Sequence, residues 1–168
     1  TLREDAQKIG SQLGKLLRMT ENGEAPADNP FPEAPYVYSY GHRNPQGLIV
    51  DATTQSIWMT EHGPKGGDEL NRIDAGKNYG WPAITYGVDY SGAIISPFTE
   101  APGMEQPVTY WVPSIATSGL VLYTSSAIPS LTGKLLVGGL KAKKVVAVDV
   151  SGDTPVLSEP FPDLEARV

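Results

Sequence analysis

Two short loops hold most of the side chains in this sequence that could do chemistry. The first, Gly41-His-Arg-Asn-Pro-Gln-Gly47, places Arg43 and Asn44 side by side before a proline. A planar, permanently charged guanidinium suits a carboxylate or a developing oxyanion, and Pro45 biases Asn44 toward an extended backbone. The residues alone favour a plainer interpretation, in which Arg43 pairs with a nearby acid and Asn44 caps a turn.

The second loop, Glu61-His-Gly-Pro-Lys-Gly-Gly-Asp-Glu69, follows fourteen residues later and offers backbone carbonyls beside Asp68 and Glu69. Calcium takes oxygen ligands only, so an irregular loop with one or two carboxylates can bind it. The EF-hand spacing is absent, however, and the metal signal is weak by itself. A solvated acidic turn is the favoured alternative.

The only histidines, His42 and His62, lie in these loops and could titrate near neutral pH. Neither has a serine or cysteine nucleophile arranged around it in the sequence. The motifs G-x-S-x-G, G-x-x-x-x-G-K-[ST] and G-x-G-x-x-G are all missing. Serine-hydrolase, nucleotide and nicotinamide chemistry are therefore disfavoured.

Composition excludes several classes of partner. The net charge is −6, and the one dense basic cluster, Lys141, Lys143 and Lys144, is expected at a solvated strand edge, so nucleic acid is not a partner. There is no cysteine for a disulfide or a thiolate metal site. No run approaches the roughly 18 apolar residues of a membrane span, and no signal peptide is visible. The start at Thr1 reads as the interior of a longer gene product.

The elements that must position these loops are strands. Residues 1–19 are ambiguous between helix and strand, although 14–19 favours a strand, and 20–35 is an extended proline-rich loop. Alternation and β-branched content predict further strands at 36–40, 48–50, 57–59, 70–73, 108–111, 120–123, 135–137, 145–148 and 156–157.

Short strands every 8–12 residues with turns between them indicate an all-β sandwich, barrel or propeller. If the fold is a propeller, about 40 residues per blade gives about three to four blades. The ring would then be incomplete, and its two open blade edges would invite self-association.

Several motifs in succession resemble one family. The two loops are followed by Asn78-Tyr-Gly-Trp-Pro82, Glu105-Gln-Pro107 and Gly139-Leu-Lys141. This order resembles the soluble quinone-dependent glucose/sorbosone dehydrogenases, and the bacterial aldose sugar dehydrogenase branch fits best. The resemblance implies a single partial domain over 1–168, truncated at both ends, from a six-bladed β-propeller that uses pyrroloquinoline quinone (PQQ) and calcium.

The resemblance also assigns roles to particular positions. Arg43 would be catalytic, stabilising the charge that develops on the quinone. The side chains that would contact PQQ are Arg43, Asn44, Tyr90, Lys141 and Arg167. The residues that would bind calcium, partly through main-chain carbonyls, are Gly63, Pro64, Glu69 and Tyr79.

Departures from the family pattern limit what this chain can do. The histidine that serves the family as general base lies upstream of Thr1, and neither His42 nor His62 takes that position. The arginine that would pair with Arg167 is also absent, and Val112 stands where glucose-specific relatives have a tryptophan over the cofactor.

The resemblance implies that the parent protein oxidises the C1 hydroxyl of aldose sugars to lactones and passes electrons to an external acceptor, in the periplasm or outside the cell. Little or no turnover is expected from the isolated chain. The main alternative is a non-catalytic propeller that binds a sugar or a protein partner, and a calcium lactonase is a weaker third.

Overall fold

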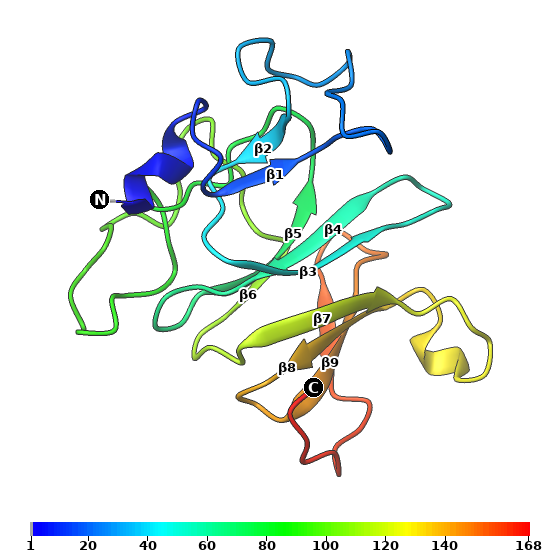
Figure 1. Cartoon of the computed structure of the whole chain (residues 1–168). Coiled ribbons are helices and arrows are strands. Elements are labelled where there is room, and N and C mark those ends of the chain that lie inside the picture. The colour runs from blue at the N-terminus through cyan, green and yellow to red at the C-terminus, as the bar shows by residue number, and fades with distance from the viewer. Residues whose placement is uncertain (1) are drawn as a thin grey trace.

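The computed structural model of this chain describes residues 2–168, and its regular elements are mainly antiparallel strands (Figure 1). The expectation of an all-β chain is confirmed. Within the described residues, no helix has the length and apolar character needed to cross a membrane. The elements are the 3-10 helices η1 (Leu2–Gln7) and η2 (Pro129–Leu131) and the strands β1 (Lys15–Leu17), β2 (Val37–Tyr40), β3 (Pro45–Val50), β4 (Ile57–Glu61), β5 (Asp68–Ile73), β6 (Thr109–Trp111), β7 (Thr117–Leu122), β8 (Leu135–Gly139), β9 (Lys144–Asp149) and β10 (Val156–Ser158).

Each expected strand is present. The structure differs from the expected boundaries in two places, at the start of the chain and at the start of β5. The ambiguous segment at the start forms a short 3-10 helix followed by β1, with Thr1 outside the described residues. The second loop is shorter than expected because Asp68 and Glu69 already belong to β5. They pair there with Trp111 and Tyr110 of β6.

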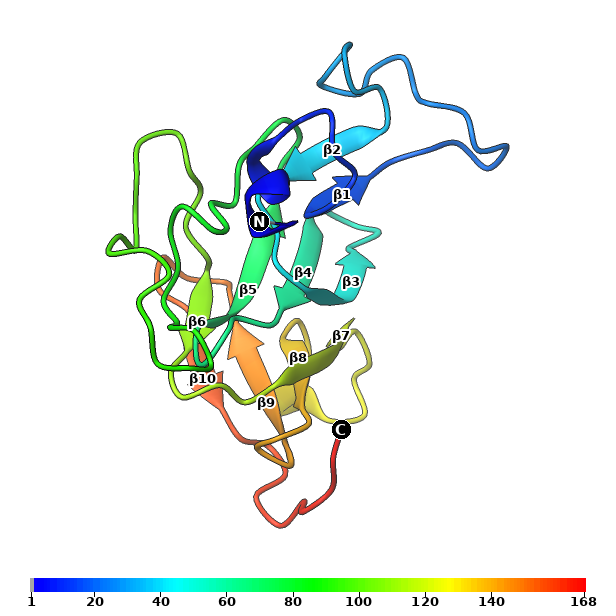
Figure 2. The ribbon, with the colours of Figure 1, turned by 60° about the vertical axis from the view of Figure 1, so that its left-hand side comes forward.

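The strands form two four-stranded antiparallel meanders and one two-stranded sheet. The meanders run β3-β4-β5-β6 and β7-β8-β9-β10 in simple sequence order, and β1 pairs with β2. Their first strands, β3 and β7, lie side by side (Figures 1 and 2). Two such sheets, packed face to face with their first strands adjacent, have the arrangement of neighbouring propeller blades.

The seam between the two meanders needs a glycine. A Cβ at Gly47 would lie 2.6 Å from the Cβ of Leu120 and 2.8 Å from the carbonyl oxygen of Ser118, so only glycine allows this approach. The buried hydroxyl of Thr60 closes the seam, since it accepts from the Gly47 amide and donates to the Ser118 carbonyl, both at 3.0 Å. The relative position of the two sheets is therefore fixed beside the first loop.

Two apolar clusters hold the sheets together. The larger lies between the two meanders and includes Leu70, Trp111, Leu135 and Val137. The smaller, around Met59, joins the first meander to the β1–β2 sheet. Between β1 and β2 the chain has no helix or strand and reaches out from the body of the protein, as Figure 2 shows.

Candidate functional site

The loops singled out in the sequence lie along one edge of the two meanders. In the ladders, Glu61 at the end of β4 is paired with both Pro45 and Glu69 at the starts of β3 and β5, and Thr117 at the start of β7 is paired with Gly139 at the end of β8. Antiparallel neighbours reverse direction, so these strand ends share an edge. The connecting segments 41–44, 62–67, 112–116 and 140–143 are therefore gathered there. They carry Arg43, Asn44, Gly63, Pro64 and Lys141.

Arg43 is held by its backbone and by its side chain. Its amide donates to Glu61 Oε2 at 2.7 Å, and its Nη1 donates to the His62 carbonyl at 3.1 Å. The guanidinium carbon lies 5.3 Å from the centroid of the Trp81 ring, a cation–π distance. The plainer expectation, a guanidinium paired with an acid, is wrong. The neighbouring Asn44 is exposed and accepts from Gln46 Nε2 at 3.2 Å.

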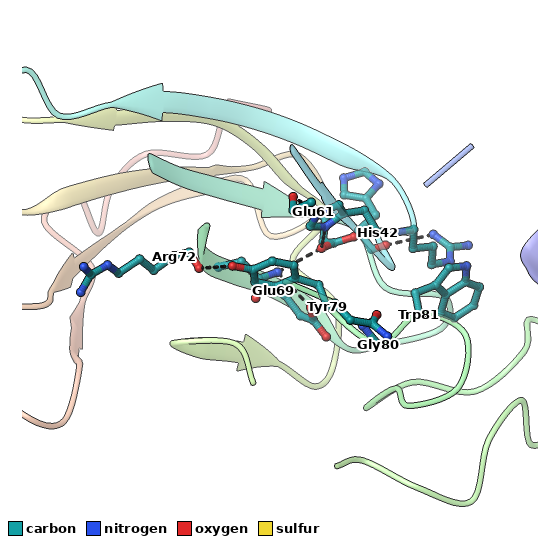
Figure 3. Close-up of polar contacts among 12 residues, drawn as sticks. His42, Glu61, Glu69, Arg72, Tyr79, Gly80 and Trp81 are labelled. Carbon is teal, nitrogen blue, oxygen red and sulfur yellow. Dashed lines mark hydrogen bonds and ion pairs between the residues drawn. The ribbon is translucent and has the colours of Figure 1, made fainter. Parts of the chain in front are cut away.

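The residue before Arg43 belongs to a buried Ser39–His42–Glu61 line, of which Figure 3 labels His42 and Glu61. Ser39 Oγ is 2.8 Å from His42 Nε2, and His42 Nδ1 is 3.2 Å from Glu61 Oε1. The imidazole stacks on Tyr79 at 4.8 Å. This serine, three residues before the histidine, was not apparent from the sequence as its partner. Because Ser39 and His42 have no exposed surface, a substrate does not reach the hydroxyl, and the line serves structure rather than hydrolysis.

Asp68 anchors the second loop. Its Oδ1 accepts from the Gly63 amide at 3.1 Å, and its Oδ2 accepts from Ser114 Oγ and the Ala116 amide, both at 2.7 Å, and from the Thr117 amide at 3.3 Å. The residue has no exposed surface. A solvated acidic turn is therefore the wrong description, since this carboxylate ties the 62–67 loop to the segment that enters β7.

The same loop is tightly folded at Gly63. A Cβ there would lie 2.2 Å from the carbonyl oxygens of both Gly66 and Gly67. Within residues 2–168, no hydrogen bond reaches the carbonyl oxygens of Gly63 and Pro64. Both carbonyls therefore keep their lone pairs available.

Glu69 lies next to a second buried carboxylate. Asn71 Nδ2 donates to Glu61 Oε1 at 3.0 Å and to Glu69 Oε2 at 3.1 Å. Burial, reinforced by the charge of Glu61, raises the pKa of Glu69 to about 8. The buried Oδ1 of Asn71 has no hydrogen-bond partner among the described residues. Two carboxyl groups therefore share one amide donor, whose own oxygen has no donor among the described residues.

Tyr79 lies beside this group with its side chain already engaged. Its hydroxyl donates to the Arg72 carbonyl at 2.7 Å and accepts from the Asp74 amide at 2.8 Å (Figure 3). Burial raises the pKa of this phenol above its usual value, so it stays neutral. The Tyr79 amide donates to the Tyr40 carbonyl, which brings the 78–81 segment alongside the first loop.

The remaining cofactor candidates are Tyr90, Lys141 and Arg167. Tyr90 is 72% exposed, and the side chains of Lys141 and Arg167 are also exposed. Within residues 2–168, none of these three side chains forms a hydrogen bond or ion pair. The Lys141 amide does donate to the Ile115 carbonyl, which places the β8–β9 turn beside the segment anchored by Asp68.

Sequence reasoning missed several residues of this edge. Trp81 stood within a quoted motif, but nothing indicated that its ring lies under a guanidinium. One signal could have identified Asn71. It is a polar residue between the apolar Leu70 and Ile73, and its partner in β4 is the buried Met59.

Comparison with known proteins decides the family. Residues 1–168 match the family described as Glucose / Sorbosone dehydrogenase. The chain belongs to the glucose/sorbosone dehydrogenase family. Among curated relatives, it is 45% identical over 157 residues to the aldose sugar dehydrogenase YliI of Escherichia coli K12, covering 90% of this chain and 42% of that protein. It is 38% identical over 91 residues to the quinoprotein glucose dehydrogenase B of Acinetobacter calcoaceticus, covering 53% of this chain and 19% of that protein.

Solved structures place this family member within a β-propeller. The apo soluble aldose sugar dehydrogenase from Escherichia coli matches with a TM-score of 0.88 and 42% identity, over 96% of this chain and 48% of that one. The PQQ-bound aldose sugar dehydrogenase from Streptomyces coelicolor matches with a TM-score of 0.73 and 32% identity, over 96% and 43%. The chain thus spans about half the length of these relatives. The expected fold, part of a six-bladed propeller, is confirmed, and its blades are the two meanders and the smaller β1–β2 sheet.

Proposed function

We propose that this chain supplies part of the cofactor site of a PQQ- and calcium-dependent aldose sugar dehydrogenase. The parent protein would oxidise the C1 hydroxyl of aldose sugars to lactones, with an external electron acceptor and a location in the periplasm or outside the cell. The observation that carries the proposal is the shared edge at which Arg43, Asn44 and the Gly63–Pro64 loop are gathered. The PQQ-bound relative supports the identity of the cofactor.

The first loop fits an anionic planar quinone. Arg43 uses one guanidinium nitrogen on the His62 carbonyl, and within residues 2–168 its other nitrogens donate no hydrogen bond. A cavity of about 380 Å³ is lined by Arg43, Asn44, Trp81 and residues of the amino-terminal segment. PQQ, when bound, supplies the electron sink for sugar oxidation. Arg43 would place a fixed positive charge against the quinone oxygen, and Asn44 would offer an amide donor.

The second loop fits a hard cation. The carbonyls of Gly63 and Pro64 accept no hydrogen bond from the described residues, and the Gly63 amide is turned to Asp68. Calcium prefers such oxygen ligands and tolerates main-chain carbonyls in irregular loops. A calcium ion held here would bring positive charge to the edge that carries Arg43, where a cofactor with several carboxylates would be bound.

A second cation position is proposed at Glu69 with the carbonyl of Tyr79. The unpartnered Oδ1 of Asn71 and the raised pKa of Glu69 fit a site that is stabilised when positive charge enters. Within residues 2–168, no group of three or more His, Asp or Glu side chains is arranged to hold a metal ion, so main-chain and amide oxygens must complete either site. Calcium titration measures the number of ions bound per chain, and so distinguishes one occupied position from two.

The cofactor proposal is tested by titrating the chain with PQQ, with and without calcium, and following the cofactor absorbance. Arg43→Ala is compared with Arg72→Ala, which removes an exposed arginine directed away from Trp81 in Figure 3. We expect calcium-dependent binding in the wild type and in Arg72→Ala. Arg43→Ala should bind about 10- to 100-fold more weakly, the loss of a charge-assisted hydrogen bond. Equal binding by the two variants, or none by the wild type, would contradict the proposal.

An assay of sugar oxidation distinguishes a chain that only binds the cofactor from a complete enzyme. No side chain of this chain is assigned as the general base, because His42 is buried and His62 is engaged with the Thr117 carbonyl at 2.5 Å. The isolated chain with PQQ and calcium is therefore expected to oxidise sugars slowly or not at all. Sugar oxidation as fast as that of a full-length family member would overturn this expectation.

A further inference from the structure

The carboxylate of Glu61 occupies a junction in the buried part of the edge. It is 3% exposed and stands at the end of β4, between the first loop and β5. Its Oε2 accepts from the Arg43 amide at 2.7 Å, while its Oε1 is contacted by His42 Nδ1 at 3.2 Å and by Asn71 Nδ2 at 3.0 Å. Three hydrogen bonds from two chain segments, the first loop and β5, therefore meet on one side chain.

The backbone of the first loop depends on this carboxylate at one position. The Gly41 and His42 amides donate to carbonyls of the amino-terminal segment, Ala6 and Gly14. The Arg43 amide, next along the chain, has Glu61 as its acceptor. A charged acceptor gives a shorter and stronger bond to a backbone amide than a neutral one. The position of the Arg43 backbone, and hence the start of its side chain, is set by Glu61.

The orientation of Glu61 is fixed in turn from behind. Ser39 Oγ lies 2.8 Å from His42 Nε2, and both residues have no exposed surface. The bonds are mutually consistent when Ser39 donates to Nε2 and the neutral imidazole donates its Nδ1 hydrogen to Glu61. Tyr79, stacked on the ring, holds the imidazole plane. Glu61 therefore has a defined rotamer in advance of any ligand, which is what a supporting residue must provide.

We propose that Glu61 is a positioning residue for the quinone site, which fixes Arg43 through its backbone amide and is itself held by His42 and Asn71. This inference rests on the proposed function of Arg43. Glu61 acts through Arg43 and does not touch the cofactor, so its effect on PQQ affinity disappears when the Arg43 side chain is absent.

A double-mutant cycle in PQQ affinity tests this dependence at saturating calcium. The proteins are the wild type, Glu61→Gln, Arg43→Ala and the double variant, with Glu33→Gln, an exposed acid of the proline-rich loop, as control. Glu61→Gln keeps the side-chain volume but removes the charge and turns an amide group toward a donor. We expect it to weaken PQQ binding about 10-fold, in line with loss of one charge-assisted hydrogen bond, and less than twofold in the Arg43→Ala background. An equal loss in both backgrounds would overturn the proposal.

A second readout reports the contact without the cofactor. In ¹⁵N-labelled wild-type chain the Arg43 amide should exchange slowly and resonate downfield, and Glu61→Gln should shift it upfield and accelerate exchange at least 10-fold while the core amide of Leu70 is unchanged. If Glu61→Gln does not fold, Ser39→Ala loosens the same support from the far side of His42 and should give a smaller change of the same sign. An Arg43 amide unaffected by either variant would overturn the proposal.

The two readouts separate this inference from the function on which it rests. A wild-type chain that binds no PQQ, although the Arg43 amide responds to Glu61→Gln, would overturn the proposed function. PQQ binding that depends on Arg43 but not on Glu61 would overturn the positioning role alone.

Discussion

Replacing Asp68 with asparagine should weaken the hydrogen bonds that hold the second loop against the segment entering β7. The carboxylate accepts four hydrogen bonds in a fully buried position, three of them from the backbone amides of Gly63, Ala116 and Thr117. Asparagine has one acceptor oxygen, and its amide group must face at least one of these donors. The least costly orientation turns the new amide toward Gly63, because Oδ2 serves the other three donors.

The expected cost follows from that orientation. One buried amide left unpaired costs about 1–3 kcal/mol, and loss of the charge weakens the remaining bonds by about 1 kcal/mol in total. Asp68→Asn should therefore lower the free energy of unfolding by about 3 kcal/mol. The control, Asp74→Asn, removes an exposed carboxylate just beyond β5 and should change it by less than about 0.5 kcal/mol.

Equilibrium denaturation in urea, followed by tryptophan fluorescence, measures both variants. The slope against urea should match the wild type if the folded and unfolded states expose the same surface as before. Asp68→Asn should also weaken calcium-dependent PQQ binding, because the carbonyls of Gly63 and Pro64 are no longer fixed. A loss of less than about 1 kcal/mol would contradict a buried, fully bonded Asp68, because a solvated carboxylate would behave in that way.

Three further predictions test the packing and the charges of the same edge. Gly63→Ala should destabilise the chain by about 1–3 kcal/mol through contact with the Gly66 and Gly67 carbonyls, whereas Gly119→Ala, where a Cβ meets no atom within 4 Å, should not; equal melting temperatures would contradict this. Because the pKa of Glu69 is raised to about 8 from 4.5, the folded chain binds the extra proton, so in chelator the unfolding free energy should fall as pH rises from 4.5 to 8. Glu69→Gln should flatten that slope in urea titrations, and an unchanged slope would refute the assignment. Thr60→Val should lower the free energy of unfolding by about 1–3 kcal/mol, since it leaves the buried Gly47 amide unpaired. Wild-type stability of this variant in urea denaturation would contradict the role of Thr60 in joining the two sheets.

The strands were predictable because their signal is local. Alternating or β-branched runs such as 36–40 and 145–148 favour strands at those positions before any partner strand is known. The motifs identified the family because they occur in order along the whole chain. The burial of Asp68 could not be predicted in this way. Its donors lie both five residues before it and 46 to 49 residues after it, and they meet only when the two sheets pack.

The same physical reason explains the errors at the first loop. Arg43 was expected to pair with an acid because the sequence shows the charge but not the ring of Trp81 or the carbonyl that receives its hydrogen bond. Ser39 is three residues from His42, but only the bend at Gly41, where φ is +79°, turns their side chains toward each other. Contacts that depend on such turns are formed by the tertiary structure and carry no pattern along the chain.

The decisive measurement for the proposed PQQ and calcium site is a crystal structure of this chain with both bound. We expect the quinone in contact with Arg43 and Asn44, and a calcium ion, confirmed by its anomalous scattering, ligated by the carbonyls of Gly63 and Pro64. PQQ bound away from this edge, or calcium bound without those two carbonyls, would contradict it.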